Sequence, residues 1–314
     1  MKPPQIPIQT PAKPLSSRHG KELLLLRSLT ALVGIPVLLG AIWFGAPWLT
    51  ALVVAAGLVA IWELYRMTPS LVGPLPVLLG AAWVVAIISG AQAASGRDNF
   101  LVISGGVMAA GSFTALLWFI AFYRGAESDG RGDDSAGKKR FPIGLAYLVL
   151  GPVYIGFFLA TALMLREVTG SEVEGTADLG RSWLLFAILV TFAVDTGAYL
   201  VGHAVGSRPL APSISPNKTW EGSAGGFISA VAAAMVLGLV FDLGVPVWQQ
   251  AVIGAVVGVV AQWGDLIESK LKRLADVKDA GSIIPGHGGL LDRLDSMLLS
   301  LPAVYFLVVT VFVQ

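Results

Sequence analysis

The sequence predicts an all-α, polytopic integral membrane protein with about nine transmembrane helices and a cytoplasmic N-terminus. Composition is the first reason: hydrophobic residues make up 55% of the 314 residues and charged residues only 13%. A soluble domain carries roughly 25% charged residues. The mean hydropathy of +0.75 is the second reason. The third is that the apolar residues form long separate runs, which in lipid favour helices because a helix satisfies every backbone polar group within the segment.

Nine segments are long enough to cross the hydrocarbon core as helix, which takes roughly 20 apolar residues. They lie near residues 23–44, 47–65, 74–94, 100–123, 141–165, 183–202, 223–243, 246–264 and 296–313. The first segment is expected to be an uncleaved helix. It is too long for a signal peptide, lacks a small-residue cleavage site and is followed at once by another span.

The segments divide the chain into three predicted regions. Residues 1–20 are proline-rich and basic, which is typical of a disordered tail. Residues 21–165 are expected to form an N-terminal transmembrane scaffold of about five helices, which also offers the contact for a homodimer. Residues 166–314 are expected to form a C-terminal catalytic region of about four helices with cytoplasmic motif loops. The Gly-rich loop 124–140 is read as a mobile linker.

The distribution of basic residues predicts the orientation. With a cytoplasmic N-terminus, nine spans leave 18 of the 21 Lys and Arg residues inside, and only Arg97, Arg166 and Arg181 outside. Such an asymmetry follows the positive-inside rule. The loops that carry most polar residues are therefore predicted to face the cytoplasm.

Two features of the composition exclude function classes. The chain has no cysteine, so disulfides, zinc–thiolate sites and thiol nucleophiles are excluded. The formal net charge of +1 gives no signal for a polyanionic partner, and no nucleic-acid partner is expected. The expected surroundings are the lipid bilayer.

The most informative stretch follows the eighth span. If helix continues there, Asp265, Ser269 and Lys272 stand at i, i+4 and i+7 and share one face at the membrane boundary. In the next helix Asp292 and Asp295 form an i, i+3 pair. Carboxylates from two helices make an oxygen-rich site that suits a magnesium-like cation. Contact with lipid head groups is the alternative for the basic residues alone.

The segment between these two helices is rich in glycine. Residues 279–289 cannot form a continuous helix, because Pro285 and several glycines interrupt it. The "PGHGG" run brings bare backbone close to a ligand and offers N–H donors to phosphate oxygens. Together with the carboxylates and lysines around it, this segment predicts a metal–phosphate site.

Polar groups at three other places in the sequence allow either a functional or a purely structural role. "DTGAY" (195–199) places Asp195 late in the sixth span, where ionisable groups usually face a polar site. "SPNKTWEG" (215–222) supplies hydrogen-bond donors, although such loops are often plain turns. Glu63 near the inner end of the second span either joins a polar funnel or pairs with Arg66.

The stretch "SKLKRLADVKDAGSIIPGHGGLLDRLD" (Ser269–Asp295) resembles the signature of the phosphatidate cytidylyltransferase, or CDP-diacylglycerol synthase, family. Every fixed position of that signature is filled. The resemblance extends upstream through "GDLIES", "SPNKTWEG" and "DTGAYLVGHAVG" and covers roughly the last 120 residues; the first half matches as a run of hydrophobic spans. Two positions depart from the family pattern: His203, where the family usually has Arg, and Asn217, where it often has Lys.

The resemblance implies an enzyme that transfers the cytidylyl group of CTP to phosphatidic acid and releases pyrophosphate. It also implies a bacterial cytoplasmic (inner) membrane location. The expected cofactor is Mg2+ or Mn2+, with a second, monovalent cation such as K+ as an option. The phosphate of phosphatidic acid is itself the nucleophile, so in-line attack requires positioning more than a general base.

Residue roles follow as hypotheses. The catalytic group comprises Asp265, Ser269, Lys272, Asp292 and Asp295, of which Asp265, Asp292 and Asp295 are the expected metal ligands. The expected substrate-binding residues are Ser215, Lys218, Thr219, Arg273, Lys278, Gly286, His287, Gly288, Gly289 and Arg293.

Three alternatives stay open at this point. The nearest is a related membrane enzyme with another lipid acceptor or nucleotide. The second is an intramembrane aspartyl protease using Asp195 and Asp265, which leaves the lysines and the Asp292/Asp295 pair without a role. The third is a transporter, whose charges line a midplane pathway, whereas here they gather at one membrane face.

Overall fold

The structure, a computed structural model, describes residues 17–68, 74–94, 96–126, 144–168, 178–284 and 288–312. Eight helices in these ranges are long and apolar enough to cross a membrane, by length and composition. A further apolar helix, Ser28–Phe44, is shorter than these eight. The all-α, polytopic class predicted from composition is confirmed.

The helices follow one another along the chain with short connections. The span Gly144–Arg166 contains a π-helical turn, η3, and helix α6. The bounds are α1 Ser17–Phe44, α2 Trp48–Arg66, α3 Pro74–Ala93, α4 Arg97–Ala126, η3 Val153–Phe157, α6 Phe158–Arg166, α7 Leu179–Val205, α8 Trp220–Val240, α9 Val247–Leu274, α10 Leu291–Leu307 and η4 Val308–Phe312. α1 begins inside the predicted tail, while residues 1–16 and 127–143 lie outside the described ranges.

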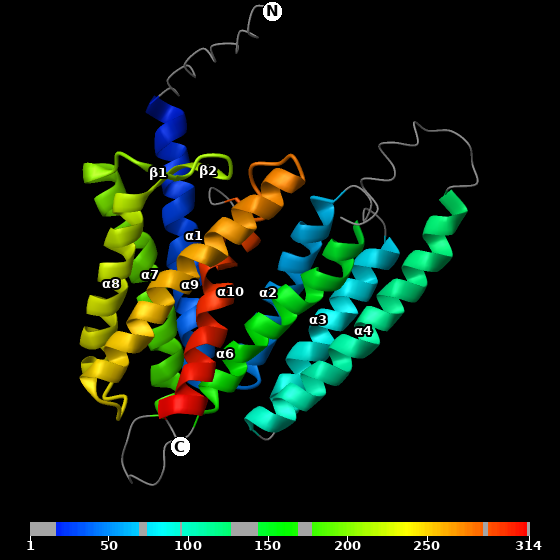
Figure 1. The fold of residues 1–314 in the computed structure, drawn as a ribbon, viewed down its shortest axis with the longest axis horizontal. Coiled ribbons are helices and arrows are strands. Elements are labelled where there is room, and N and C mark those ends of the chain that lie inside the picture. The colour runs from blue at the N-terminus through cyan, green and yellow to red at the C-terminus, as the bar shows by residue number, and fades with distance from the viewer. Residues whose placement is uncertain are drawn as a thin grey trace, which may run out of the picture.

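Successive helices run in alternating directions (Figure 1). The C-terminal ends of α2, α4, α7 and α9 therefore lie at the same end of the molecule as the start of α10, at the top of the view. The basic residues predicted to lie outside belong to the opposite end: Arg97 starts α4, Arg166 ends α6 and Arg181 lies in the first turn of α7. This is the arrangement that the positive-inside prediction requires.

A small β-hairpin joins α7 to α8 at the upper end of the view (Figure 1). Strand β1 (Pro209–Ala211) pairs antiparallel with β2 (Ser215–Thr219). Glu221 binds the segment that precedes β1. Its carboxylate accepts hydrogen bonds from the backbone N–H groups of Ser207 and Arg208, at 3.1 and 3.2 Å. Thr219 then caps α8 by accepting from the N–H of Gly222 at 3.1 Å. The sequence suggested a turn here, and strands this short give almost no periodic signal.

Small residues bring the last helices close together. A Cβ added at Gly264 of α9 would overlap the backbone oxygen of Asp295 in α10, and one added at Gly254 would lie 2.7 Å from Ala234 of α8. Such close approach is typical of helix packing in membranes, where van der Waals contact replaces the hydrophobic driving force. The backbones of α9 and α10 therefore meet beside the carboxylates predicted to form the site.

One buried apolar cluster runs through both halves of the chain. It includes Ile61 and Leu64 of α2, Trp183 of α7, and Leu298 and Tyr305 of α10. The N-terminal helices and the motif-bearing helices therefore share a core, and α2 reaches the start of α10.

Candidate active site

Four carboxylates from three helices line one polar cavity at the hairpin end. Asp195 comes from α7, Asp265 from α9, and Asp292 and Asp295 from α10. The cavity has a volume of about 600 Å3. It is also lined by Lys218, Thr219, Asn217, Gln262, Arg293 and Ser296. The helices thus bring together side chains that lie up to 101 residues apart in sequence.

Of the predicted α9 face, Asp265 and Ser269 contact each other, whereas Lys272 pairs with Glu268 and Asp292. Ser269 donates its hydroxyl to Asp265 Oδ1 at 3.3 Å. Lys218 from β2 forms an ion pair with Asp265 Oδ2. The hairpin therefore places a cation against the carboxylate that the sequence predicts as a metal ligand.

Lys272 lies between two carboxylates. Its Nζ is 2.7 Å from Asp292 Oδ1 and 2.5 Å from Glu268 Oε2. Glu268 is fully buried, and the Lys272 side chain is 13% exposed. A buried charge is tolerated only when it is paired, because removing it from water costs several kcal/mol. Lys272 therefore joins α9 to α10 and neutralises part of the local negative charge.

Asp292 organises the loop before α10. Besides Lys272, its carboxylate accepts hydrogen bonds from the N–H of Ala280 at 3.0 Å and from the N–H of Gly289 at 3.1 Å. Acceptors at the first turn of a helix also interact favourably with the helix dipole. The Asp292 side chain is 9% exposed. Its two oxygens are engaged by protein donors, and its predicted metal role stays a prediction.

Asp295 is in a different environment from Asp292. It lines the same cavity as two other carboxylates, Asp265 and Asp195. Its Oδ1 accepts from the N–H of the next residue, Ser296, at 2.6 Å, and Ser296 donates its hydroxyl to Asp195 Oδ1 at 3.3 Å. Three carboxylates thus approach one another around this part of the cavity, with Lys218 as the cation nearest to Asp265.

The carboxylate oxygens of this cavity are of the kind that hard divalent cations prefer. Among the described residues, no three His, Cys, Asp or Glu side chains form a ready cluster for a metal. Mg2+ does not require one, because it is usually held by one or two carboxylates, several waters and substrate phosphates. Asp265 and Asp295 face the same cavity and offer carboxylate oxygens of the kind that Mg2+ prefers.

The predicted substrate-binding residues are distributed over this end of the molecule. Lys218, Thr219 and Arg293 line the polar cavity. Arg273 turns toward backbone oxygens instead and donates to Ile214 O and Val277 O, both at 3.3 Å. Ser215 starts β2 and Lys278 lies exposed on the loop after α9; neither is part of the cavity lining of the described residues.

The glycine-rich segment is partly described. Gly288, with φ of +89°, exchanges two backbone hydrogen bonds with Ile284. The N–H of Gly288 therefore binds Ile284 O, and that of Gly289 binds Asp292, as given above. Gly286 and His287 lie outside the described residues. The predicted phosphate contacts of this segment stay predictions.

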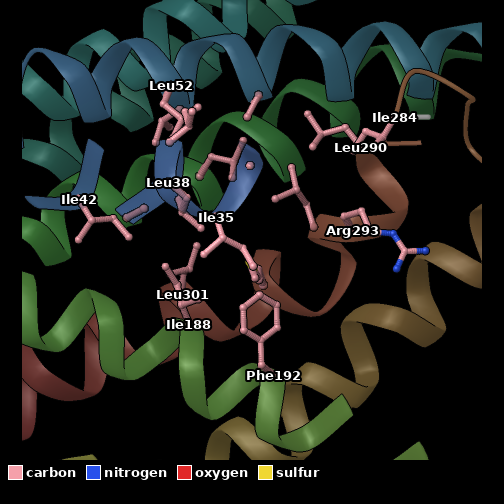
Figure 2. Close-up of a pocket in the computed structure, with 18 of the residues that line it drawn as sticks. Ile35, Leu38, Ile42, Leu52, Ile188, Phe192, Ile284, Leu290, Arg293 and Leu301 are labelled. Carbon is pink, nitrogen blue, oxygen red and sulfur yellow. The ribbon is translucent and has the colours of Figure 1, made fainter. Parts of the chain in front are cut away.

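A second cavity, of about 700 Å3, adjoins the first and is lined mainly by apolar side chains of α1, α2, α7 and α10 (Figure 2). Figure 2 shows Leu38, Leu52, Ile188 and Phe192 around it, with Arg293 at one edge. Both cavities share the charged residues Asp195, Asp292, Arg293 and Asp295. An apolar chamber and a polar chamber therefore meet at one charged rim.

Sequence reasoning missed one carboxylate, Glu268. It stands one helical turn before Lys272, so i, i+4 spacing could have predicted their ion pair. Glu63 was expected either in a polar funnel or paired with Arg66, and its contact with the start of α10 was not predicted, because no local signal shows a contact across 227 positions. Asp195, whose role the sequence left open, lines both cavities.

Comparisons with known proteins agree with this geometry. A sequence model of the cytidylyltransferase family matches residues 25–311. The chain is 33% identical over 286 residues to a phosphatidate cytidylyltransferase of Bacillus subtilis, covering 90% of this chain and 96% of that protein. It is 31% identical over 286 residues to a phosphatidate cytidylyltransferase of Staphylococcus saprophyticus, covering 91% and 99%. The chain is therefore a member of the cytidylyltransferase family.

Proposed function

We propose that the protein is a phosphatidate cytidylyltransferase of phospholipid biosynthesis. It transfers CMP from CTP to phosphatidic acid and gives CDP-diacylglycerol and pyrophosphate. The observation that carries the proposal is the charged rim shared by an apolar and a polar cavity. One substrate is a diacyl lipid and the other a water-soluble polyanion, and an enzyme for both needs the two environments side by side. The names of the relatives support the same activity.

The apolar cavity fits the acyl chains of the lipid. Its lining comes from membrane-spanning parts of α1, α2, α7 and α10, so a lipid in the bilayer can enter without leaving an apolar environment. Its phosphate then lies at the rim, beside Arg293. Arg293 is exposed and makes no ion pair among the described residues, which leaves its guanidinium available for a phosphate.

The polar cavity fits the triphosphate. Lys218 and Arg293 supply fixed positive charge, and Thr219 and Ser269 supply hydroxyl groups beside the carboxylates. The attacking oxygen is already anionic near neutral pH, so the residues act by orientation and by charge stabilisation rather than by deprotonation. When CTP binds, Lys218 can exchange Asp265 for a phosphate oxygen.

We propose Mg2+ or Mn2+ as the cofactor, with Asp265 and Asp295 as the residues that hold it and Asp292 as the third predicted ligand. A bound divalent cation neutralises the charge that develops on the leaving pyrophosphate. The carboxylates of Asp265 and Asp295 would contribute the protein oxygen ligands that hold it in the cavity. A second, monovalent cation such as K+ is part of the same proposal.

Location and assembly complete the proposal. The family members compared above are bacterial, and we propose the inner membrane with the hairpin end in the cytoplasm, where CTP is available. We also propose a homodimer through the N-terminal helices. Its support is the exposed apolar surface of α1, where Leu32 is 69% and Val33 64% exposed.

The activity is tested with the purified full-length protein in detergent micelles. With phosphatidic acid, CTP and Mg2+ we expect release of pyrophosphate and a CMP-bearing lipid detected by mass spectrometry. EDTA is expected to stop the reaction, excess Mg2+ to restore it, and ATP to replace CTP poorly. A folded preparation that forms no such lipid would contradict the proposal and favour another lipid acceptor.

A second test addresses the lipid chamber. Leu38 lines the apolar cavity (Figure 2), and Leu38→Trp fills part of it. We expect catalytic efficiency toward phosphatidic acid to fall about tenfold while KM for CTP stays unchanged, because excluding even one methylene of an acyl chain from an apolar pocket costs roughly 1–3 kcal/mol. Leu39→Trp is the matched control, since Leu39 is 49% exposed and lies outside the described lining. Equal effects of both substitutions would contradict the placement.

A further inference from the structure

Glu63 makes an unusual contact for a residue in the last turn of an N-terminal membrane helix. The residue belongs to α2 and is 1% exposed. Its carboxylate accepts hydrogen bonds from the backbone N–H of Leu290 at 3.1 Å and from that of Leu291 at 2.8 Å. These two residues are the N-cap and the first residue of α10.

This contact replaces a cap that α10 does not have. The first N–H groups of a helix have no partner within the helix, and a Ser, Thr, Asp or Asn side chain at the N-cap usually supplies one. Here the N-cap is Leu290, which makes no side-chain cap hydrogen bond. Glu63 supplies both acceptors from another helix, and its negative charge lies at the positive end of the α10 dipole.

No cation of the described residues accounts for the buried charge of Glu63. The nearest arginine along α2, Arg66, lies over the Trp62 ring at 4.6 Å and forms no ion pair with Glu63. A buried carboxylate is costly unless it is hydrogen-bonded. The start of α10 is therefore the structural partner that keeps Glu63 in place.

The loop before α10 is shaped to receive this carboxylate. A Cβ at Gly289 would lie 2.9 Å from Glu63 Oε2, and one at Gly281 would overlap Glu63 Oε1. Asp292 binds the same loop, through the N–H groups of Ala280 and Gly289. Two carboxylates thus bind the same short segment of backbone.

We propose that Glu63 is a positioning residue for cytidylyl transfer. By capping α10 from α2 it fixes the axis and rotation of the first turns of that helix, and so the direction in which Asp292 and Asp295 project into the cavity. The inference rests on the proposed function for its kinetic readout. It extends the active site to a residue of the N-terminal half.

The test compares two full-length variants of Glu63 with a control variant, Glu167→Gln. Glu63→Gln keeps the shape and one acceptor oxygen but loses the charge, whereas Glu63→Ala removes both acceptors. Because a misplacement of about 1 Å costs on the order of 10²-fold in rate, we expect kcat to fall about tenfold in Glu63→Gln and about 100-fold in Glu63→Ala. KM for CTP is expected to stay within about twofold, because Lys218 and Arg293 are untouched.

Glu167→Gln is the matched control. Glu167 also accepts an interhelical hydrogen bond, from Gln92 Nε2 at 2.7 Å, but follows α6 at the opposite end of the bundle. Its substitution removes the charge from a helix–helix contact and leaves the cavity unchanged, so kcat is expected to stay normal. Hydrogen–deuterium exchange adds a structural readout: Glu63→Gln should speed exchange in peptides covering residues 289–295 and leave α8 unchanged.

The outcomes separate this inference from the proposed function. A wild-type kcat in Glu63→Gln and Glu63→Ala would overturn the role of Glu63, and so would a loss confined to KM. If Glu63→Ala fails to fold, Glu63→Gln decides; a Glu63→Gln protein that also fails to fold would show a purely structural residue and overturn the proposal. If the wild type forms no CMP-bearing lipid, the proposed function fails first. Unchanged exchange at residues 289–295 would then overturn the capping role as well.

Discussion

Asp295→Asn is expected to lower kcat by on the order of 10³-fold, the size of effect seen when one electrostatic stabiliser of a transition state is lost, without lowering the melting temperature. Asp295 shares one cavity with the carboxylates of Asp265 and Asp195, so like charges gather there in the free protein and become useful when a cation and the triphosphate are present. Removing the charge relieves repulsion. We therefore expect the melting temperature to stay equal or to rise, the usual relation between a strained site and stability.

The measurement is the rate of CMP-lipid formation together with thermal unfolding in the same detergent. Asp98→Asn is the control, because Asp98 is a carboxylate in the first turn of α4 with its side chain 83% exposed. It should leave both quantities unchanged. Near-normal turnover of Asp295→Asn would exclude Asp295 from the catalytic group.

Asp292→Asn is expected to abolish turnover as well, with the opposite effect on stability. Asp292 attracts Lys272 at 2.7 Å and holds two loop N–H groups. An amide keeps the shape but loses the charge that Lys272 needs, and the buried ammonium is left with Glu268 alone. We expect the protein to remain folded with a lower melting temperature, since losing one partner of a buried ion pair is destabilising.

Comparing the two variants separates the roles of the two aspartates. Both belong to the same helix and differ by one turn, so a general disturbance of α10 would change their melting temperatures in the same direction. Opposite directions would support a Lys272-paired Asp292 and a cation-binding Asp295. A normal rate for Asp292→Asn would remove that residue from the proposed metal site.

The parts of the site that the sequence predicted are those set by helical periodicity. Asp265 and Ser269 were expected on one face of a continued eighth span, and α9 does extend to Leu274 with a hydrogen bond between them. The pair Asp292 and Asp295 was expected on a new helix, and α10 begins one residue before it. Local spacing determines such relationships, and the sequence displays it directly.

The parts that the sequence could not predict depend on packing between distant elements. Glu63 meets Leu291 across 228 positions, and Lys218 reaches Asp265 from a hairpin with strands of three and five residues. Neither contact has a periodic signature. Asp292 and Asp295 also have different surroundings because α9 packs against one side of α10. That packing depends on the close approach of the two backbones at Gly264.

The shared rim of the two cavities also has a kinetic consequence. A substrate in the apolar chamber comes from the plane of the bilayer, so its effective concentration is a mole fraction of the lipid surface. A substrate in the polar chamber comes from water and is counted in molar units. Adding inert detergent at constant total phosphatidic acid should therefore slow the reaction by surface dilution, while the CTP dependence keeps its midpoint. Rates compared between preparations are meaningful only at matched lipid-to-detergent ratio.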